Sequence, residues 1–109
     1  MYIIVRLDLT IGQQMAQLVH ANTEYILNNL SDSTDWYNNS NYVVCLNVKD
    51  EEQLSFLSSK LEASGINHSR FTEPDLNNSL TSISFIGNSD VKKFISSLPL
   101  AGKEAICQK

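Results

Sequence analysis

Two short runs rich in β-branched residues stand on either side of a long segment with helical character. The runs are Tyr2–Leu7 (YIIVRL) and Tyr42–Val48 (YVVCLNV). Each has the near-continuous apolar character of a strand that is buried on both faces. A helix between two such strands predicts a βαβ unit, in which the strands lie parallel through a right-handed crossover. This unit places the chain in the α/β class of folds.

The segment between the two strands starts with a helix signal. Thr10 and Gln13 form the Thr-x-x-Gln pattern of a capping box. We expect the helix to run to about Leu30, and residues 28–41 to form a polar excursion held in place by aromatic side chains. Six apolar residues at helical spacing predict the stripe that faces the core. They are Ile11, Met15, Leu18, Val19, Ile26 and Leu30.

The second half of the chain predicts one more helix, two strands and a short final helix. Asp50 caps the helix, its leucines face the core, and Gly65 ends it. The turn between the last two strands is too short for a helical crossover, so these strands are expected to be antiparallel. The expected elements are an edge strand at Ile66–Thr72, a turn at 73–79, a strand at Leu80–Ile86, a helix at 90–98 capped by Ser89, and a tail at 103–109.

These elements predict one domain that spans residues 1–109. Its fold class is α/β, with a mixed four-stranded sheet, helices packed on that sheet and the order β-α-β-α-β-β-α. The net charge is −4, with only eight Lys and Arg residues, which argues against a broad nucleic-acid surface. Two cysteines exclude a disulfide framework and favour a reducing, cytoplasmic environment. No apolar run is long enough for a membrane helix, so no membrane partner is expected.

One face of the first helix carries a row of polar side chains. Gln13, Gln17, His20 and Glu24 follow one another at helical spacing. His20 can exchange a proton near neutral pH, and Glu24 can orient its ring. The alternative is a solvated helix face. His20 and Glu24 could also ligate a metal ion with His68, but such a set is incomplete, so no metal is expected.

A second candidate feature lies before the last strand. Glu73 and Asp75 flank Pro74, and two nearby carboxylates can serve acid–base or positioning roles. Thr81 can point its hydroxyl at the same space. The alternative is an ordinary Asp-rich turn. Cys45 lies in an apolar strand and Cys107 in the tail, so neither is expected to be a nucleophile.

The first of these segments resembles the opening of the class II peptidyl-tRNA hydrolase family. Ile3–Ala21 has that family's hydrophobic strand, Arg-x-Asp-Leu, glycine turn and Ala-Gln-x-x-His-Ala helix. Residues 71–76 with 80–83 are similar to a shortened-loop branch of the same family, and the likeness covers about residues 2–100. The matching residues of the opening are Arg6, Asp8, Leu9, Gly12, Ala16, Gln17, His20 and Ala21.

The resemblance implies a cytoplasmic homodimer that hydrolyses the ester between a peptide and the 3′ end of tRNA, without a cofactor. Its catalytic residues would be His20, Thr81 and either Glu73 or Asp75. Gln13, Gln17 and Glu24 are candidates for substrate binding. The glycine turn reads Gly-Gln-Gln, where the family has Gly-Lys-Gly-Lys. Two alternatives remain open at this point: a binding module whose hydrolase site has decayed, and a hydrolase of a small non-nucleic substrate.

Overall fold

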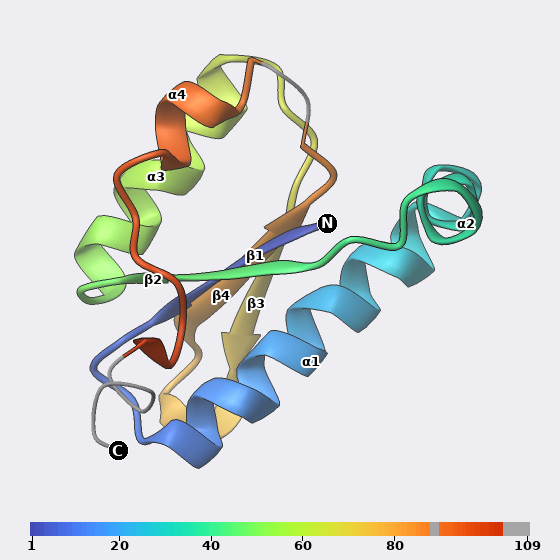
Figure 1. Cartoon of the computed structure of the whole chain (residues 1–109). Coiled ribbons are helices and arrows are strands. Elements are labelled where there is room, and N and C mark those ends of the chain that lie inside the picture. Colours follow the sequence, from blue (N-terminus) through green and yellow to red (C-terminus); the bar gives the residue numbers. More distant parts are fainter. Residues whose placement is uncertain (88–89, 104–109) are drawn as a thin grey trace.

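The computed structural model describes residues 1–87 and 90–103, which form a four-stranded sheet with helices on both faces (Figure 1). The strand order is β2-β1-β4-β3. β1 pairs with β2 in parallel, and β4 is antiparallel to both β1 and β3. The mixed sheet and the relative strand directions are therefore as predicted. The strands are β1 (Tyr2–Arg6), β2 (Val44–Val48), β3 (Ser69–Glu73) and β4 (Ser79–Phe85).

Helices cover both faces of this sheet. Figure 1 shows α1 along one face, with α3 and α4 on the other. The helices are α1 (Ile11–Asn28), α2 (Leu30–Asn39), α3 (Glu51–Ala63) and α4 (Lys92–Ile95), with a short 3₁₀ helix η1 (Pro74–Leu76) between β3 and β4. No helix in the described part of the chain has the length and apolar character needed to cross a membrane.

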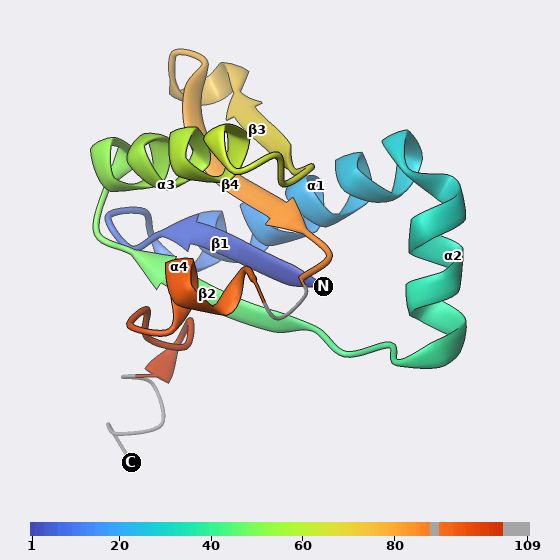
Figure 2. The same cartoon turned by 90° about the horizontal axis from the view of Figure 1, so that it is seen from above.

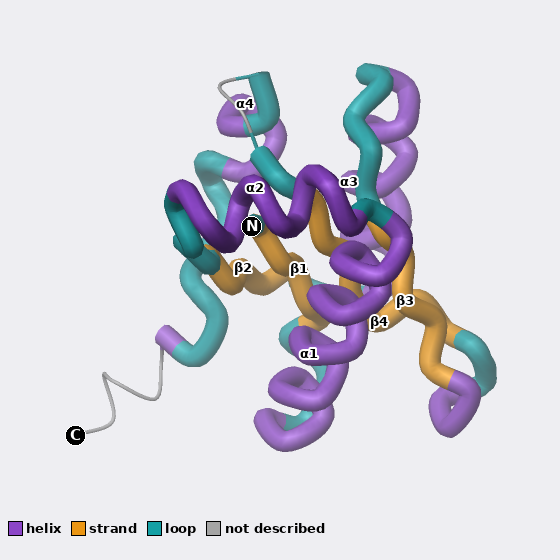
Figure 3. Tube along the Cα trace, turned by 90° about the vertical axis from the view of Figure 1, so that its right-hand side faces the viewer, coloured by secondary structure: helices purple, strands orange, loops and turns teal. Residues whose placement is uncertain are grey.

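The polar excursion between α1 and β2 contains a helix that the sequence did not predict. α1 ends at Asn28, and Leu30 begins α2 instead of ending α1. Asn39 Nδ2 donates to Asp35 Oδ1 over 2.7 Å, and Trp36 Nε1 donates to the carbonyl of Tyr42 over 2.8 Å. These local bonds stabilise a helix despite its polar composition. Figures 2 and 3 show α2 standing across the end of α1, beyond the sheet.

α3 follows its predicted pattern closely. The Asp50 side chain accepts the backbone N–H of Gln53 at 2.9 Å. Leu54, Leu57 and Leu61 are buried against the sheet. Gly65 ends the helix with a φ of 72°, a left-handed conformation that glycine adopts without strain.

The predicted apolar stripe of α1 is wrong. Ile11, Met15 and Val19 are 61%, 62% and 64% exposed, and Leu30 is exposed at the start of α2. Leu18 and Ile26 are only half-buried, at the margin of the core. The face of α1 that is buried consists of Gln14, Gln17, Ala21 and Tyr25.

The sheet surface under α1 explains this inversion. Two serines of β4 face the helix, and their hydroxyls donate to its backbone carbonyls. Ser82 Oγ bonds the carbonyl of Gln17 over 2.8 Å, and Ser84 Oγ bonds that of Ala21 over 2.7 Å. Small polar side chains on the sheet therefore select small and amide side chains on the helix. Hydrogen bonds to β4 therefore add to the burial of Ala21 and Tyr25 in positioning α1, whereas leucines position α3.

The outer edge of β2 is covered by the segment that follows α4. Asn47 donates its backbone N–H to Pro99, and Ala101 donates to Cys45, over 2.9 and 2.8 Å. β3 forms the opposite edge, as predicted. The final helix is shorter than the expected 90–98 and covers Lys92–Ile95. The predicted cap at Ser89, the tail from residue 104 and Cys107 lie outside the described residues.

Candidate active site

Four chain segments come together at one edge of the sheet. The register pairs Arg6 with Val48, Val5 with Ser82, and Glu73 with Ser79. The carboxyl ends of β1, β2 and β3 therefore lie beside the amino end of β4. α1 also begins at this edge, directly after β1 (Figure 1). α/β proteins commonly build their sites at the carboxyl ends of strands.

The amide of Gln17 joins Glu73 to Thr81 at this edge. Gln17 Nε2 donates to Glu73 Oε1 over 2.9 Å, and Thr81 Oγ1 donates to Gln17 Oε1 over 2.6 Å. A carboxylate can only accept, so this orientation of the amide satisfies all three groups. Gln17 is 3% exposed. Glu73 therefore contacts α1 directly through Gln17.

A β-bulge brings the Thr81 hydroxyl to α1. Phe71 pairs with Ser82, but Thr72 pairs with Leu80, which leaves Thr81 as an extra residue on β4. Neighbouring strand residues normally point to opposite faces. Here the hydroxyls of Thr81 and Ser82 both bond Gln17. The bulge re-aims one side chain, as bulges near active sites commonly do.

His20 lies one helical turn beyond Gln17 and is exposed. Its ring stacks on Phe71 of β3, with the ring centroids 4.6 Å apart and the planes 17° apart. Beside the two rings is a shallow hollow of about 370 Å³, lined also by Glu24 and Leu27. No hydrogen bond joins His20 to Glu73 or Asp75 in residues 1–87 and 90–103.

The remaining predicted residues border this cluster. Asp75 is exposed in η1, and its backbone N–H lies 3.4 Å from Glu73 Oε2. Gln13 is exposed at the start of α1, where its side chain accepts the N–H of Thr10 over 3.0 Å. The Thr10 hydroxyl accepts the N–H of Gln13 over 3.2 Å, which confirms the predicted capping box.

Two buried amides that the sequence reading missed hold the start of α1. Gln14 Nε2 donates to the carbonyl of Leu9 over 2.9 Å, and Asn47 Nδ2 donates to Gln14 Oε1 over 3.0 Å. Both side chains are buried. Gln14 therefore anchors the turn before α1 and does not face solvent. One signal could have found Asn47, because it is a polar residue inside an apolar strand.

The Arg6–Asp8 pair fixes the ends of two strands. Arg6 Nε and Nη2 each donate to an Asp8 carboxylate oxygen over 2.9 Å, and Nη1 donates to the carbonyl of Leu80 over 3.2 Å. The hydrogen bond from Arg6 holds the pKa of Asp8 below its ordinary value. This fork ties the end of β1 to the residue that precedes Thr81.

The possible metal set and the cysteine can also be placed. Within residues 1–87 and 90–103, no three His, Cys, Asp or Glu side chains gather into a metal-binding group. The Nε2 atom of His68 lies 2.7 Å from the hydroxyl of Ser58 on α3, on the face of the sheet away from His20. Burial raises the pKa of the Cys45 thiol, which disfavours the reactive thiolate.

A family model described as peptidyl-tRNA hydrolase PTH2 matches residues 1–101. The chain belongs to this family. No curated protein matches the chain. Membership of the PTH2 family gives the chain a peptidyl-tRNA hydrolase-like function in translation, with peptidyl-tRNA as the substrate. In this PTH2 domain, the chain of hydrogen bonds from Glu73 through Gln17 to Thr81, with His20 beside it, is the candidate active site.

Proposed function

We propose that Glu73 and His20 catalyse hydrolysis of the ester that joins the peptide to the 3′ ribose of tRNA. The observation that supports this assignment is the pair of hydrogen bonds by which Gln17 joins Glu73 to Thr81, here called the Gln17 clamp. Glu73 Oε1 accepts from Gln17 Nε2 over 2.9 Å, whereas Oε2 accepts only a longer contact of 3.4 Å from the Asp75 N–H. Because a carboxylate oxygen can accept more than one hydrogen bond, Oε2 is the oxygen that we assign to the water molecule. A half-buried carboxylate held in one orientation suits a general base better than the exposed Asp75.

In the proposed reaction, Glu73 removes a proton from the water as its oxygen attacks the ester carbonyl. A tetrahedral intermediate forms, and the bond to the ribose 3′-oxygen then breaks. His20 donates the proton that the leaving oxygen requires. The products are a peptide with a free carboxyl group and a tRNA with a free 3′-hydroxyl. One water molecule is consumed, and no cofactor takes part.

The neighbouring side chains receive supporting roles. Gln17 and Thr81 position the Glu73 carboxylate, and the stacked rings of His20 and Phe71 offer a flat surface for the substrate. Glu24 borders the adjoining hollow and is placed to contact the substrate there. Gln13 stands at the open end of α1, where a helix amino terminus attracts phosphate.

We also propose that the chain represents a shortened-loop, lysine-poor branch of the class II enzymes and acts in the cytoplasm. Two features support the branch. The connection between β3 and β4 is five residues long, the 3₁₀ helix η1 (Pro74–Leu76) followed by Asn77 and Asn78. The first turn of α1 carries Gln13 and Gln14 and no lysine. Neutral amides stabilise a developing oxyanion less than a lysine does, so slow turnover is expected.

We further propose that two copies pair through the exposed apolar row of α1, which comprises Ile11, Met15 and Val19. α1 contains no Lys or Arg, and Glu24 is its only carboxylate. Two acidic chains can therefore meet along this face without strong like-charge repulsion. Met15→Glu should shift the chain to a monomer in analytical ultracentrifugation. The matched control Phe56→Glu changes an exposed apolar residue on α3 and should not.

Hydrolysis of an N-acetyl-aminoacyl-tRNA under single-turnover conditions tests the catalytic proposal. Glu73→Gln and His20→Asn should each lower the rate by about 100-fold or more. Glu62→Gln removes an exposed carboxylate from α3 and should leave the rate unchanged. Circular dichroism establishes that each variant is folded.

Two results would contradict the assignment. Equal rates for Glu73→Gln and the wild type would exclude Glu73 as the base. Cleavage of an N-acetyl-amino-acid methyl ester without cleavage of the tRNA ester would instead favour a small, non-nucleic substrate.

A further inference from the structure

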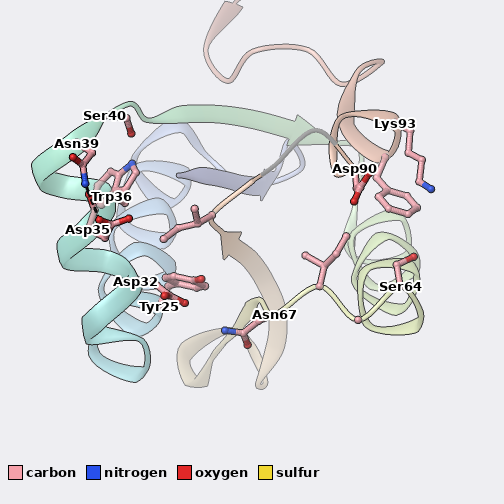
Figure 4. A pocket seen from close by; sticks show the side chains of 14 residues that line it. Tyr25, Asp32, Asp35, Trp36, Asn39, Ser40, Ser64, Asn67, Asp90 and Lys93 are labelled. Carbon is pink, nitrogen blue, oxygen red and sulfur yellow. Dashed lines mark hydrogen bonds between the residues drawn. The ribbon is translucent and has the colours of Figure 1, made fainter.

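A second cavity lies away from the candidate active site, between α2 and the region formed by α3 and α4 (Figure 4). Its volume is about 830 Å³. Tyr25 contributes to it from α1, two turns beyond Gln17, a separation of about 12 Å along the helix. A ligand in this cavity would therefore not occupy the space around Glu73 and Thr81.

The wall formed by α2 has an unusual composition. Asp32, Asp35, Trp36 and Asn39 all line the cavity, and their spacing of i, i+3, i+4 and i+7 places them on one face of the helix. A helix that packs on protein normally presents apolar residues at these positions. α2 instead turns two carboxylates and an indole toward an open space, with no basic residue in its sequence.

The side chains of this wall are held in place. Trp36 Nε1 donates to the carbonyl of Tyr42 over 2.8 Å, and Asp35 Oδ1 accepts from Asn39 over 2.7 Å. Burial raises the pKa of Tyr25, and the negative charge of Asp32 raises it further. The Asp32 carboxylate is therefore close enough to interact electrostatically with the Tyr25 hydroxyl, which lines the cavity from α1. On the opposite wall, Lys93 lies 5.2 Å from the ring centroid of Phe94.

We propose that this cavity binds an organic cation with an aliphatic body, namely a guanidinium or ammonium group from a peptide side chain or a polyamine. The Trp36 ring offers the strongest cation–π surface among the aromatic residues, and Asp32 and Asp35 supply the opposing charge. The same carboxylates repel phosphate, so the cavity is not an additional contact for tRNA. This proposal does not depend on the hydrolase assignment.

The single tryptophan of the chain allows a direct test. Fluorescence excited at a wavelength that tryptophan absorbs and tyrosine does not reports on Trp36 alone. The full chain is titrated at low salt with spermidine and, separately, with N-acetyl-argininamide. We expect a saturable change in emission with at least one of them, and the responding probe identifies the source of the cation. N-acetyl-citrullinamide, a neutral analogue of nearly the same shape, should produce no saturable change.

Two matched variants sharpen the test. Asp32→Asn should weaken binding of the responding cation by about five-fold, the effect of losing one partly exposed ion pair. Glu52→Gln removes the same charge from α3, outside the cavity, and should change the dissociation constant far less. Far-ultraviolet circular dichroism shows whether α2 persists in Asp32→Asn.

Three outcomes would overturn the proposal. They are the absence of a saturable signal with either cation, equal affinity for the neutral analogue, and equal weakening by Asp32→Asn and Glu52→Gln. The last result would show that only the overall charge of the protein attracts the cation.

Discussion

α1 and α3 pack on opposite faces of the same sheet, but by different means. α3 buries Leu54 and Leu61 completely, in the manner of an ordinary amphipathic helix. α1 buries Gln14 and Gln17 and leaves Met15 in solvent. The difference shows that leucine burial fixes the supporting face of the domain, whereas hydrogen bonds to β4 join the burial of Ala21 and Tyr25 on the face that carries the candidate site.

The largest expected contrast concerns the apolar residues of the two helices. Leu54→Ala should lower the free energy of unfolding by about 3 kcal/mol, because it opens a cavity in the core. Met15→Ala should lower it by less than about 0.5 kcal/mol, as expected for a surface site. Urea denaturation measures both, at a protein concentration low enough for the chain to be monomeric. Similar losses would mean that the two helices bury their apolar residues alike.

The next largest effect is expected at Gln17, a buried amide of α1 in the kind of position that leucines occupy on α3. Gln17→Met should lower the free energy of unfolding by about 2 kcal/mol, because Glu73 and Thr81 lose a buried partner. As a positioning residue, Gln17 should affect kcat for peptidyl-tRNA much more than KM. A variant with normal kcat and reduced stability would restrict Gln17 to a structural role.

The sequence predicted the fold well where one kind of interaction dominates. The first β-branched run, the Asp50 cap and the leucines of α3 lie as predicted, because propensity, capping and burial agree there. The second run forms a strand only from Val44, two residues later than the expected Tyr42. α1 could not be predicted in this way. An apolar stripe predicts the buried face of a helix only if the sheet surface that it faces is apolar. Here Ser82 and Ser84 make that surface polar.

The sequence pointed to some residues of the candidate site but not to the contacts that connect them. The row on the first helix and the segment before the last strand identified His20, Gln17, Glu73 and Thr81. The Gln17 clamp depends on a β-bulge in β4, in which Thr81 is the extra residue. The spacing of residues along the sequence does not reveal such a bulge. The stacking of His20 on Phe71 is likewise a tertiary contact between distant segments.

Removing the N-cap side chain should cost α1 and α3 a similar amount of unfolding free energy, although substitutions on their buried faces should not. Thr10 and Asp50 each accept the N–H of the residue three positions later. Thr10→Ala and Asp50→Ala should each lower the free energy of unfolding by about 1 kcal/mol. Thermal and urea denaturation measure both values. A much larger loss for Thr10→Ala would show that the cap also supports the candidate site.

The amino termini of α1 and α3 should differ in how strongly an added lysine increases tRNA affinity, and this effect is smaller than the changes in stability above. Gln13 and Gln53 occupy equivalent positions, but α3 has Glu51 and Glu52 in its first turn and α1 has no acidic residue there. Gln13→Lys should tighten tRNA binding and steepen its log–log salt dependence by about 0.9, the effect of one added phosphate contact. Gln53→Lys is the matched control. Equal responses would indicate attraction by overall charge alone.

The smallest expected effect is the pH dependence of the Arg6–Asp8 pair. The folded-state pKa of Asp8 lies below its ordinary value of 3.8. The pair therefore stabilises the fold above that value, and this stabilisation is lost as the pH falls through the folded-state pKa. The difference in unfolding free energy between wild type and Asp8→Asn should be constant near neutral pH and shrink below about pH 4. A difference that grows on acidification would contradict the shift.

The backbone pairing of residues 99–101 with β2 also determines at which edge of the sheet a β-strand from another molecule can be added. An unpaired strand edge is a template for strand addition and aggregation. Among the residues that the structure describes, β2 is covered and β3 is the open edge, so strand addition can proceed at one side and then stop. A chain trimmed before Pro99 would offer two templates, and two templates on each molecule are the minimum for open-ended growth into filaments.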